Sequence, residues 1–105
     1  MVKIERGNIT LTRGNTAYFK VNIDNYTYAS GDTLTMTIKS SINDNAAVIT
    51  KTIAANSTFS FVPLDTGSLD PKSYVYDVKL NIDATSEVFT VIGTHTFALV
   101  KGVGE

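Results

Sequence analysis

Hydrophobic and polar residues alternate along most of this chain with a period of two. The clearest stretch is residues 33–39, where three apolar side chains are separated by threonines. Because successive side chains of a strand point to opposite faces of a sheet, this pattern predicts a strand with one buried face and one solvated face. The same alternation predicts strands at residues 16–23 and 74–82, and the second is long enough to be central in a sheet.

Shorter apolar runs predict five further strands, at residues 8–11, 48–53, 58–62, 87–92 and 94–100. Turn-forming residues separate the runs, and we expect Gly14 and Gly31 to lie in tight turns. One helical turn is expected at residues 64–69. Short strands with turns at this spacing are typical of a β-sandwich or a small barrel.

The composition supports one all-β domain over residues 1–105. The chain has 105 residues, of which 43% are hydrophobic, so it can bury one core but not two. About one residue in seven is threonine, which suits pleated and half-buried surfaces. The absence of cysteine excludes disulfides, thiol catalysis and thiolate zinc sites.

A tyrosine near the start of the strand at residues 74–82 favours the sandwich over the barrel. Immunoglobulin-like sandwiches often carry a tyrosine corner, in which such a tyrosine bonds through its hydroxyl to the backbone a few residues upstream. Tyr74 stands four residues after Asp70, which is the required arrangement. We therefore expect an immunoglobulin-like antiparallel β-sandwich of seven to eight strands. The alternative is that Tyr74 is only an inward-facing aromatic residue.

Five segments, taken together, resemble a known family. They are ITLTRGNT (residues 9–16) with the strand that follows it, YASGDTLTMTI (28–38), VPLDT (62–66), YVYDV (74–78) and IGTHTF (92–97). In this order and spacing, the chain resembles the immunoglobulin-like domain at the N-terminus of phage baseplate upper proteins and related small phage tail proteins. It departs from them at Asn15, where an aspartate is more usual. The resemblance implies a building block that docks onto other tail proteins and carries no chemistry of its own.

No pattern of catalytic or ligand-binding residues stands out. His95 is the single histidine, and no second histidine or any cysteine exists to complete a metal or nucleophilic site with it. The nucleophile elbow G-x-S-x-G is absent. The aspartates fall mostly in loops, where turn formation is favoured over calcium binding. We expect no enzyme activity, no catalytic or metal-binding residues and no cofactor.

The net charge and the N-terminal sequence limit the kinds of partner and the location that we expect for the protein. The net charge is −1 and the basic residues are spread along the chain, which argues against nucleic-acid binding through a basic patch. The N-terminal residues contain no apolar region typical of a signal peptide, and no apolar run is long enough to span a membrane. We expect the protein in the virion or in the cytoplasm of the infected bacterial host.

The segment around Tyr26 and Tyr28 is the candidate protein interface. These two tyrosines lie in a polar loop between strong strands, and tyrosines are enriched at protein interfaces. The alternative is that they form a lid over the end of the core.

The main hypothesis is a phage-encoded structural or interaction module of the tail or baseplate. Its partners would be other phage structural proteins, and it could form a homo-oligomer. A second hypothesis is a free phage inhibitor of a host defence protein, such as an anti-CRISPR protein. A third is a glycan-binding, adhesin-like domain that uses loop tyrosines and aspartates.

Overall fold

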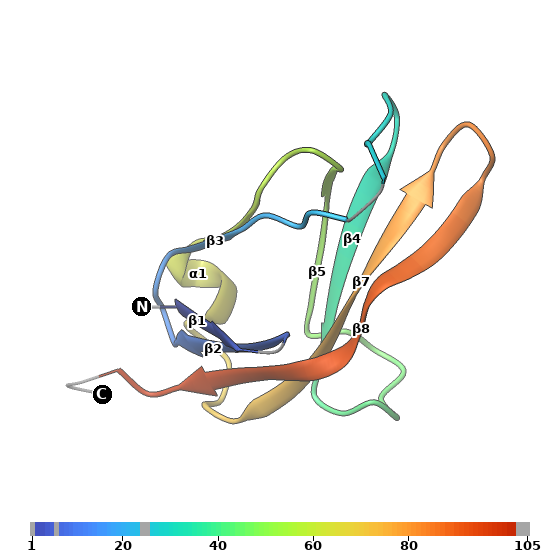
Figure 1. Cartoon of the computed structure of the whole chain (residues 1–105). Coiled ribbons are helices and arrows are strands. Elements are labelled where there is room, and N and C mark those ends of the chain that lie inside the picture. The colour runs from blue at the N-terminus through green and yellow to red at the C-terminus, as the bar shows by residue number, and fades with distance from the viewer. Residues whose placement is uncertain (1, 6, 24–25, 103–105) are drawn as a thin grey trace.

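A computed structural model describes residues 2–5, 7–23 and 26–102 and consists mostly of β-strands. Figure 1 shows their arrangement. In chain order the elements are β1 (Val2–Glu5), β2 (Asn8–Thr12), β3 (Ala17–Phe19), β4 (Thr33–Lys39), β5 (Ile49–Ala54), β6 (Phe59–Phe61), α1 (Pro63–Thr66), β7 (Ser73–Ile82) and β8 (Glu87–Val100). The all-β prediction is confirmed.

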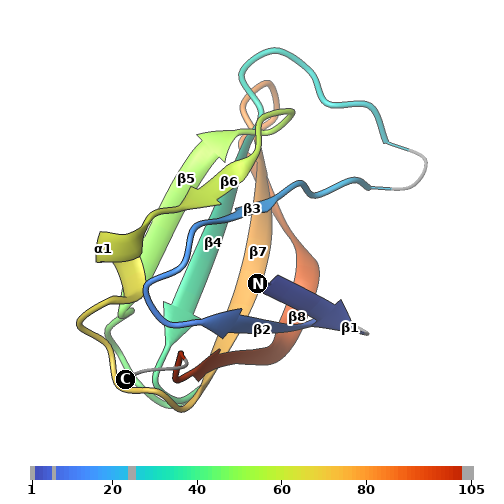
Figure 2. The same cartoon turned by 90° about the vertical axis from the view of Figure 1, so that its left-hand side faces the viewer.

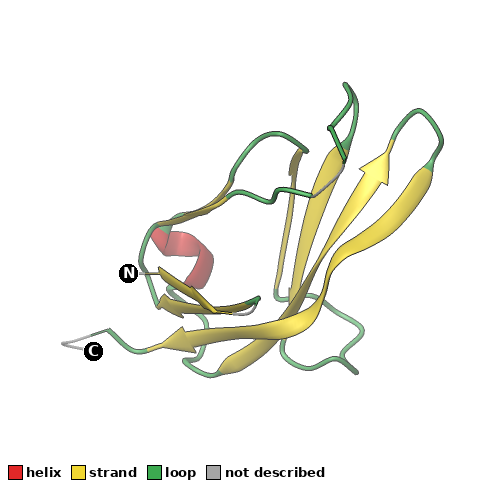
Figure 3. Cartoon of the chain, in the orientation of Figure 1, coloured by secondary structure: helices red, strands yellow, loops and turns green. Residues whose placement is uncertain are grey.

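Two sheets contain all of these strands. The larger has six strands in the order β1-β2-β8-β7-β4-β5, and the smaller pairs β3 with β6. Figure 3 shows the strands in yellow and the single helical turn in red. All strand pairs are antiparallel except β2 with β8, which run parallel. The expectation of a purely antiparallel arrangement is therefore wrong at this pair. Two parallel strands need a long connection between them, and here the connection from β2 to β8 is the rest of the domain. Hydrophobic alternation within a strand does not reveal which strand lies next to it or whether the two run parallel.

The core lies between the two sheets, and β3 and β6 lie in front of β4 and β7 in Figure 2. Phe61 of β6 links the layers, with its ring centroid 5.6 Å from Phe19 and 5.7 Å from Phe97 of β8. The largest fully buried side chains are Phe59, Phe61, Phe97, Leu11, Leu34, Met36, Ile38, Leu99, Val78 and Thr66. The alternating pattern thus places one apolar face of each sheet against the other.

Three strand predictions differ from the structure. The strand expected at residues 16–23 is only Ala17–Phe19, because its partner β6 offers just three residues for pairing. The strands expected at residues 87–92 and 94–100 form one strand, β8, which passes through Gly93 without a turn. β1 was not predicted, since its four residues gain strand character only by pairing with β2.

The connections behave as turn chemistry predicts. Gly14 and Gly31 have φ values of 81° and 94°, a left-handed conformation that glycine adopts without steric cost. The helical turn expected at residues 64–69 is α1. It begins with Pro63, and the N–H of Val62 donates to the Asp65 carboxylate at 2.7 Å.

The upstream hydrogen bond expected for Tyr74 is present. The hydroxyl of Tyr74 donates to the backbone carbonyl of Asp70 at 2.7 Å.

Candidate functional site

The two tyrosines of the candidate interface are both anchored within the chain. The Tyr26 hydroxyl donates to Asp32 Oδ2 at 2.6 Å, and the Tyr28 hydroxyl donates to the backbone carbonyl of Val21 at 2.8 Å. The two rings contact each other edge to face, with centroids 5.9 Å apart. Both side chains are half-buried and pack against the core. This geometry favours the interpretation that they form a lid over the core end.

Asp32 organises this loop, and it was not singled out from the sequence. Its side chain is 3% exposed and accepts hydrogen bonds from the Tyr26 hydroxyl and, at 2.9 Å, from the N–H of Ala29. These two bonds stabilise the carboxylate and lower the pKa of Asp32. The same contact raises the pKa of Tyr26. The signal in the sequence is an aspartate three residues after Ala29, next to Gly31, since aspartates close turns in this way.

An apolar groove lies between the segment of residues 19–23 and the large sheet. It has a volume of about 380 Å³, and its walls are residues 19–23 on one side and β8 on the other. Its lining residues are Gly7, Ile9, Phe19, Lys20, Val21, Asn22, Ile23, Met36, Tyr76, Val91 and Ile92. We call this hollow the apolar groove.

A second hollow extends the apolar groove toward the end of the β7–β8 hairpin. It has a volume of about 350 Å³ and shares Ile23 and Val91 with the groove. Phe89 forms part of its wall and is 47% exposed. Exposed apolar side chains beside an apolar hollow mark surfaces that contact other molecules.

The apolar groove is open because strand pairing stops on both of its sides. On the side facing β2, pairing of β8 within the described residues covers only Phe97 to Val100. Next to it, the N–H of Thr96 donates to Asn8 Oδ1 at 3.0 Å. On the opposite wall, β3 ends at Phe19 although the chain continues along the groove.

His95 packs against Gly7 in the β1–β2 turn, and Gly7 in turn lines the apolar groove. A Cβ atom added to Gly7 would lie 2.8 Å from the His95 ring, so the two residues are closely packed. The Tyr76 hydroxyl donates to the carbonyl of Gly7, and the Tyr76 and His95 rings are 6.4 Å apart. His95 therefore takes part in packing that fixes the β1–β2 turn to the sheet.

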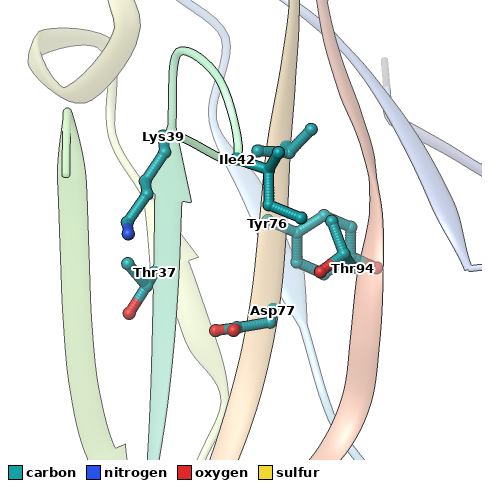
Figure 4. Close-up of a pocket in the computed structure, with 7 residues that line it drawn as sticks. Thr37, Lys39, Ile42, Tyr76, Asp77 and Thr94 are labelled. Atoms are coloured by element: carbon teal, nitrogen blue, oxygen red, sulfur yellow. The ribbon is translucent and has the colours of Figure 1, made fainter. Parts of the chain in front are cut away.

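A small pocket with mixed polar and apolar walls lies on the outer face of the large sheet (Figure 4). Thr37 from β4, Asp77 from β7 and Thr94 from β8 line it, together with Lys39 and other residues. Asp77 Oδ1 is buried and has no hydrogen-bond partner within the part of the chain that the structure describes. The volume of about 60 Å³ is room for about two water molecules, so this pocket suits bound water better than an organic substrate.

No group of three or more histidine, aspartate or glutamate side chains that could hold a metal ion occurs among residues 2–5, 7–23 and 26–102. No helix in that part of the chain has the length and apolar character needed to cross a membrane. No protein-family model matches the chain, and no curated protein or solved structure matches it.

Proposed function

We propose that the chain is an immunoglobulin-like β-sandwich that serves as a non-enzymatic structural module of a phage tail or baseplate. The strand order supports this fold. The order β8-β7-β4-β5 corresponds to strands G, F, C and C′ of a variable-type domain, and β3 with β6 corresponds to B and E. The bond from Tyr74 to Asp70 lies at the turn into the strand that corresponds to F, where such domains carry their tyrosine corner.

The apolar groove with Phe89 at its end is the observation that carries the functional proposal. Among the described residues, the walls of the groove and of the second hollow are mainly aliphatic and aromatic, with Lys20, Asn22 and Glu87 as the charged or amide side chains. Burying such surface against another protein is favourable, at roughly 25 cal/mol for each Å² of apolar area. The groove therefore suits an apolar segment of another structural protein of the same particle.

The test is incorporation of the chain into purified phage particles. We expect wild-type protein at a fixed ratio to the other tail proteins, measured by quantitative mass spectrometry of virions. The variant Phe89→Ser is expected to be incorporated at least about tenfold less, the equivalent of about 1.4 kcal/mol of binding free energy.

The matched control is Tyr18→Ser, which removes an aromatic side chain that is 67% exposed and lies outside the groove. It is expected to be incorporated like wild type. Absence of the wild-type chain from virions would contradict the tail or baseplate role. Equal incorporation of the Phe89 and Tyr18 variants would contradict the groove as the contact site.

A further inference from the structure

The outer edge of β5 is free for pairing with another strand. β5 is the last strand of the large sheet, at the end opposite β1. It pairs with β4 from Thr33↔Ala54 to Ile38↔Ile49 without any register shift, so this edge is regular. Within the residues that the structure describes, no strand pairs with its other side. The unpaired backbone N–H and C=O groups of such an edge are a template for a further strand.

Two of the features that protect edge strands are absent from β5. Edge strands are commonly protected by proline, by bulges, by charged side chains that point outward or inward, or by a covering helix or loop. β5 contains no proline and pairs with β4 without a bulge. Its one charged residue, Lys51, has a side chain that is 23% exposed and paired within the protomer. Lys51 Nζ lies 3.0 Å from Asp65 Oδ2 and 5.0 Å from the centroid of the Phe61 ring. Its charge is therefore neutralised inside the protomer.

The sequence of β5 is also self-complementary. Residues 49–53 read Ile-Thr-Lys-Thr-Ile, which is the same in both directions. In an antiparallel pair centred on Lys51, Ile49 would lie opposite Ile53 of a second copy and Thr50 opposite Thr52 of that copy. Pairs of β-branched residues and pairs of threonines stabilise neighbouring strands. A two-fold interface uses the same segment of both copies, and this segment is complementary to itself when the two strands run antiparallel.

The surroundings of the edge fit this arrangement. The two Lys51 residues would lie opposite each other at the axis, where like charges are unfavourable, and each would be compensated by its own Asp65 at 3.0 Å, so the net charge there would be zero. α1 lies beside β5 on the left-hand side of Figure 2. Leu64 of α1 is 90% exposed, and Val62 just before α1 is also exposed.

We propose that β5 pairs with β5 of a second copy of this chain, in an antiparallel two-fold dimer that joins the two large sheets. The dimer uses the outer edge of β5, and no residue of β5 lines the apolar groove. It is therefore independent of the proposed function, and either can fail without the other.

Sedimentation velocity with charge-swapped variants tests both the interface and its register. Wild type is expected to shift from monomer to dimer as its concentration rises from about 10 μM to about 1 mM. In Thr50→Lys/Thr52→Lys, each lysine would face a lysine of the second copy, and like charges directly opposite are destabilising. We expect the dissociation constant to rise at least about tenfold. The same result is expected for Thr50→Glu/Thr52→Glu.

An equimolar mixture of the two variants would place lysine opposite glutamate at both pairs, so we expect the dimer to re-form. The matched control is Thr58→Lys/Ser60→Lys, which adds the same charge at exposed positions outside β5 and is expected to dimerise like wild type. Circular dichroism of each variant checks that it is folded. A wild-type chain that stays monomeric, variants that still dimerise alone, or a folded mixture that stays monomeric would each overturn the proposal.

Discussion

The hydroxyl of Tyr74 donates a hydrogen bond to the backbone carbonyl of Asp70, four residues earlier in the chain, at 2.7 Å. Tyr74 is the first buried residue of β7, and Asp70 lies in the connection that leads from α1. The Lys72 ammonium lies 5.1 Å from the centroid of the same ring. The bond therefore fixes the direction in which the chain enters a central strand of the large sheet.

The substitution Tyr74→Phe is expected to destabilise the fold by about 1 kcal/mol, because it removes this hydrogen bond and keeps the buried ring. Urea denaturation measures the change in the free energy of unfolding. Tyr18→Phe, which alters an exposed tyrosine, is the control and should change stability by less than about 0.5 kcal/mol. Equal stability of Tyr74→Phe and wild type would show that the corner contributes nothing.

Thr66 of α1 is fully buried, and its hydroxyl accepts a hydrogen bond from the N–H of Gly14 at 2.9 Å. Thr66→Val keeps the shape of the side chain but leaves that N–H without its partner. We expect a loss of about 1–3 kcal/mol in thermal or urea denaturation. Thr66→Ser, which keeps the hydroxyl, should retain more of the stability. A valine variant as stable as the serine variant would contradict this role.

Gly7 has a φ of 84° and lies against the His95 ring, so alanine at this position meets two separate penalties. The left-handed backbone costs about 1–2 kcal/mol, and the added Cβ clashes with the ring at about 1–3 kcal/mol. In a His95→Ala background, only the backbone penalty should remain. A double-mutant cycle measures the difference. Additive effects of the two substitutions would mean that the close contact carries no energy.

Asp32 should make stability depend on pH in the acid range. Its pKa is lowered from 3.8 in the folded protein, mainly by the bond from the Tyr26 hydroxyl. The contribution is therefore complete above the unfolded pKa of 3.8 and is lost as the pH falls through the lower folded pKa. Tyr26→Phe should weaken this dependence. Urea denaturation at a series of pH values tests it, and identical slopes for Tyr26→Phe and wild type below pH 3.8 would contradict the assignment.

Sequence reasoning predicted a strand correctly where the alternation within that segment alone decides the structure. The strand expected at residues 33–39 is β4, and every second residue of it is buried, as the pattern predicts. At residues 16–23 the alternation is as clear, but strand length depends on a partner, and β6 is too short to pair with all of it. The pairing of β8 with β7 shifts register twice near Gly93, and the strand continues through this residue. The pattern within a single segment does not predict such register shifts.

Less of the candidate site than of the fold could be predicted from the sequence. The orientations of Tyr26 and Tyr28 depend on Asp32 and on the carbonyl of Val21, which are contacts between loop and strand. The apolar groove arises where the pairing of two separate strands stops, so no single segment encodes it. Phe89 reads in the sequence as an ordinary strand residue, and only the tertiary structure places it at the end of the groove.

The central claim is that the apolar groove contacts another structural protein of the phage particle. The most direct measurement is photo-crosslinking in assembled particles, with benzoylphenylalanine in place of Phe89 in one sample and of Tyr18 in another. We predict a crosslink from position 89 to one defined tail protein and none from position 18. Particles that contain the chain but give no crosslink from position 89, or give equal crosslinks from both positions, would contradict the claim.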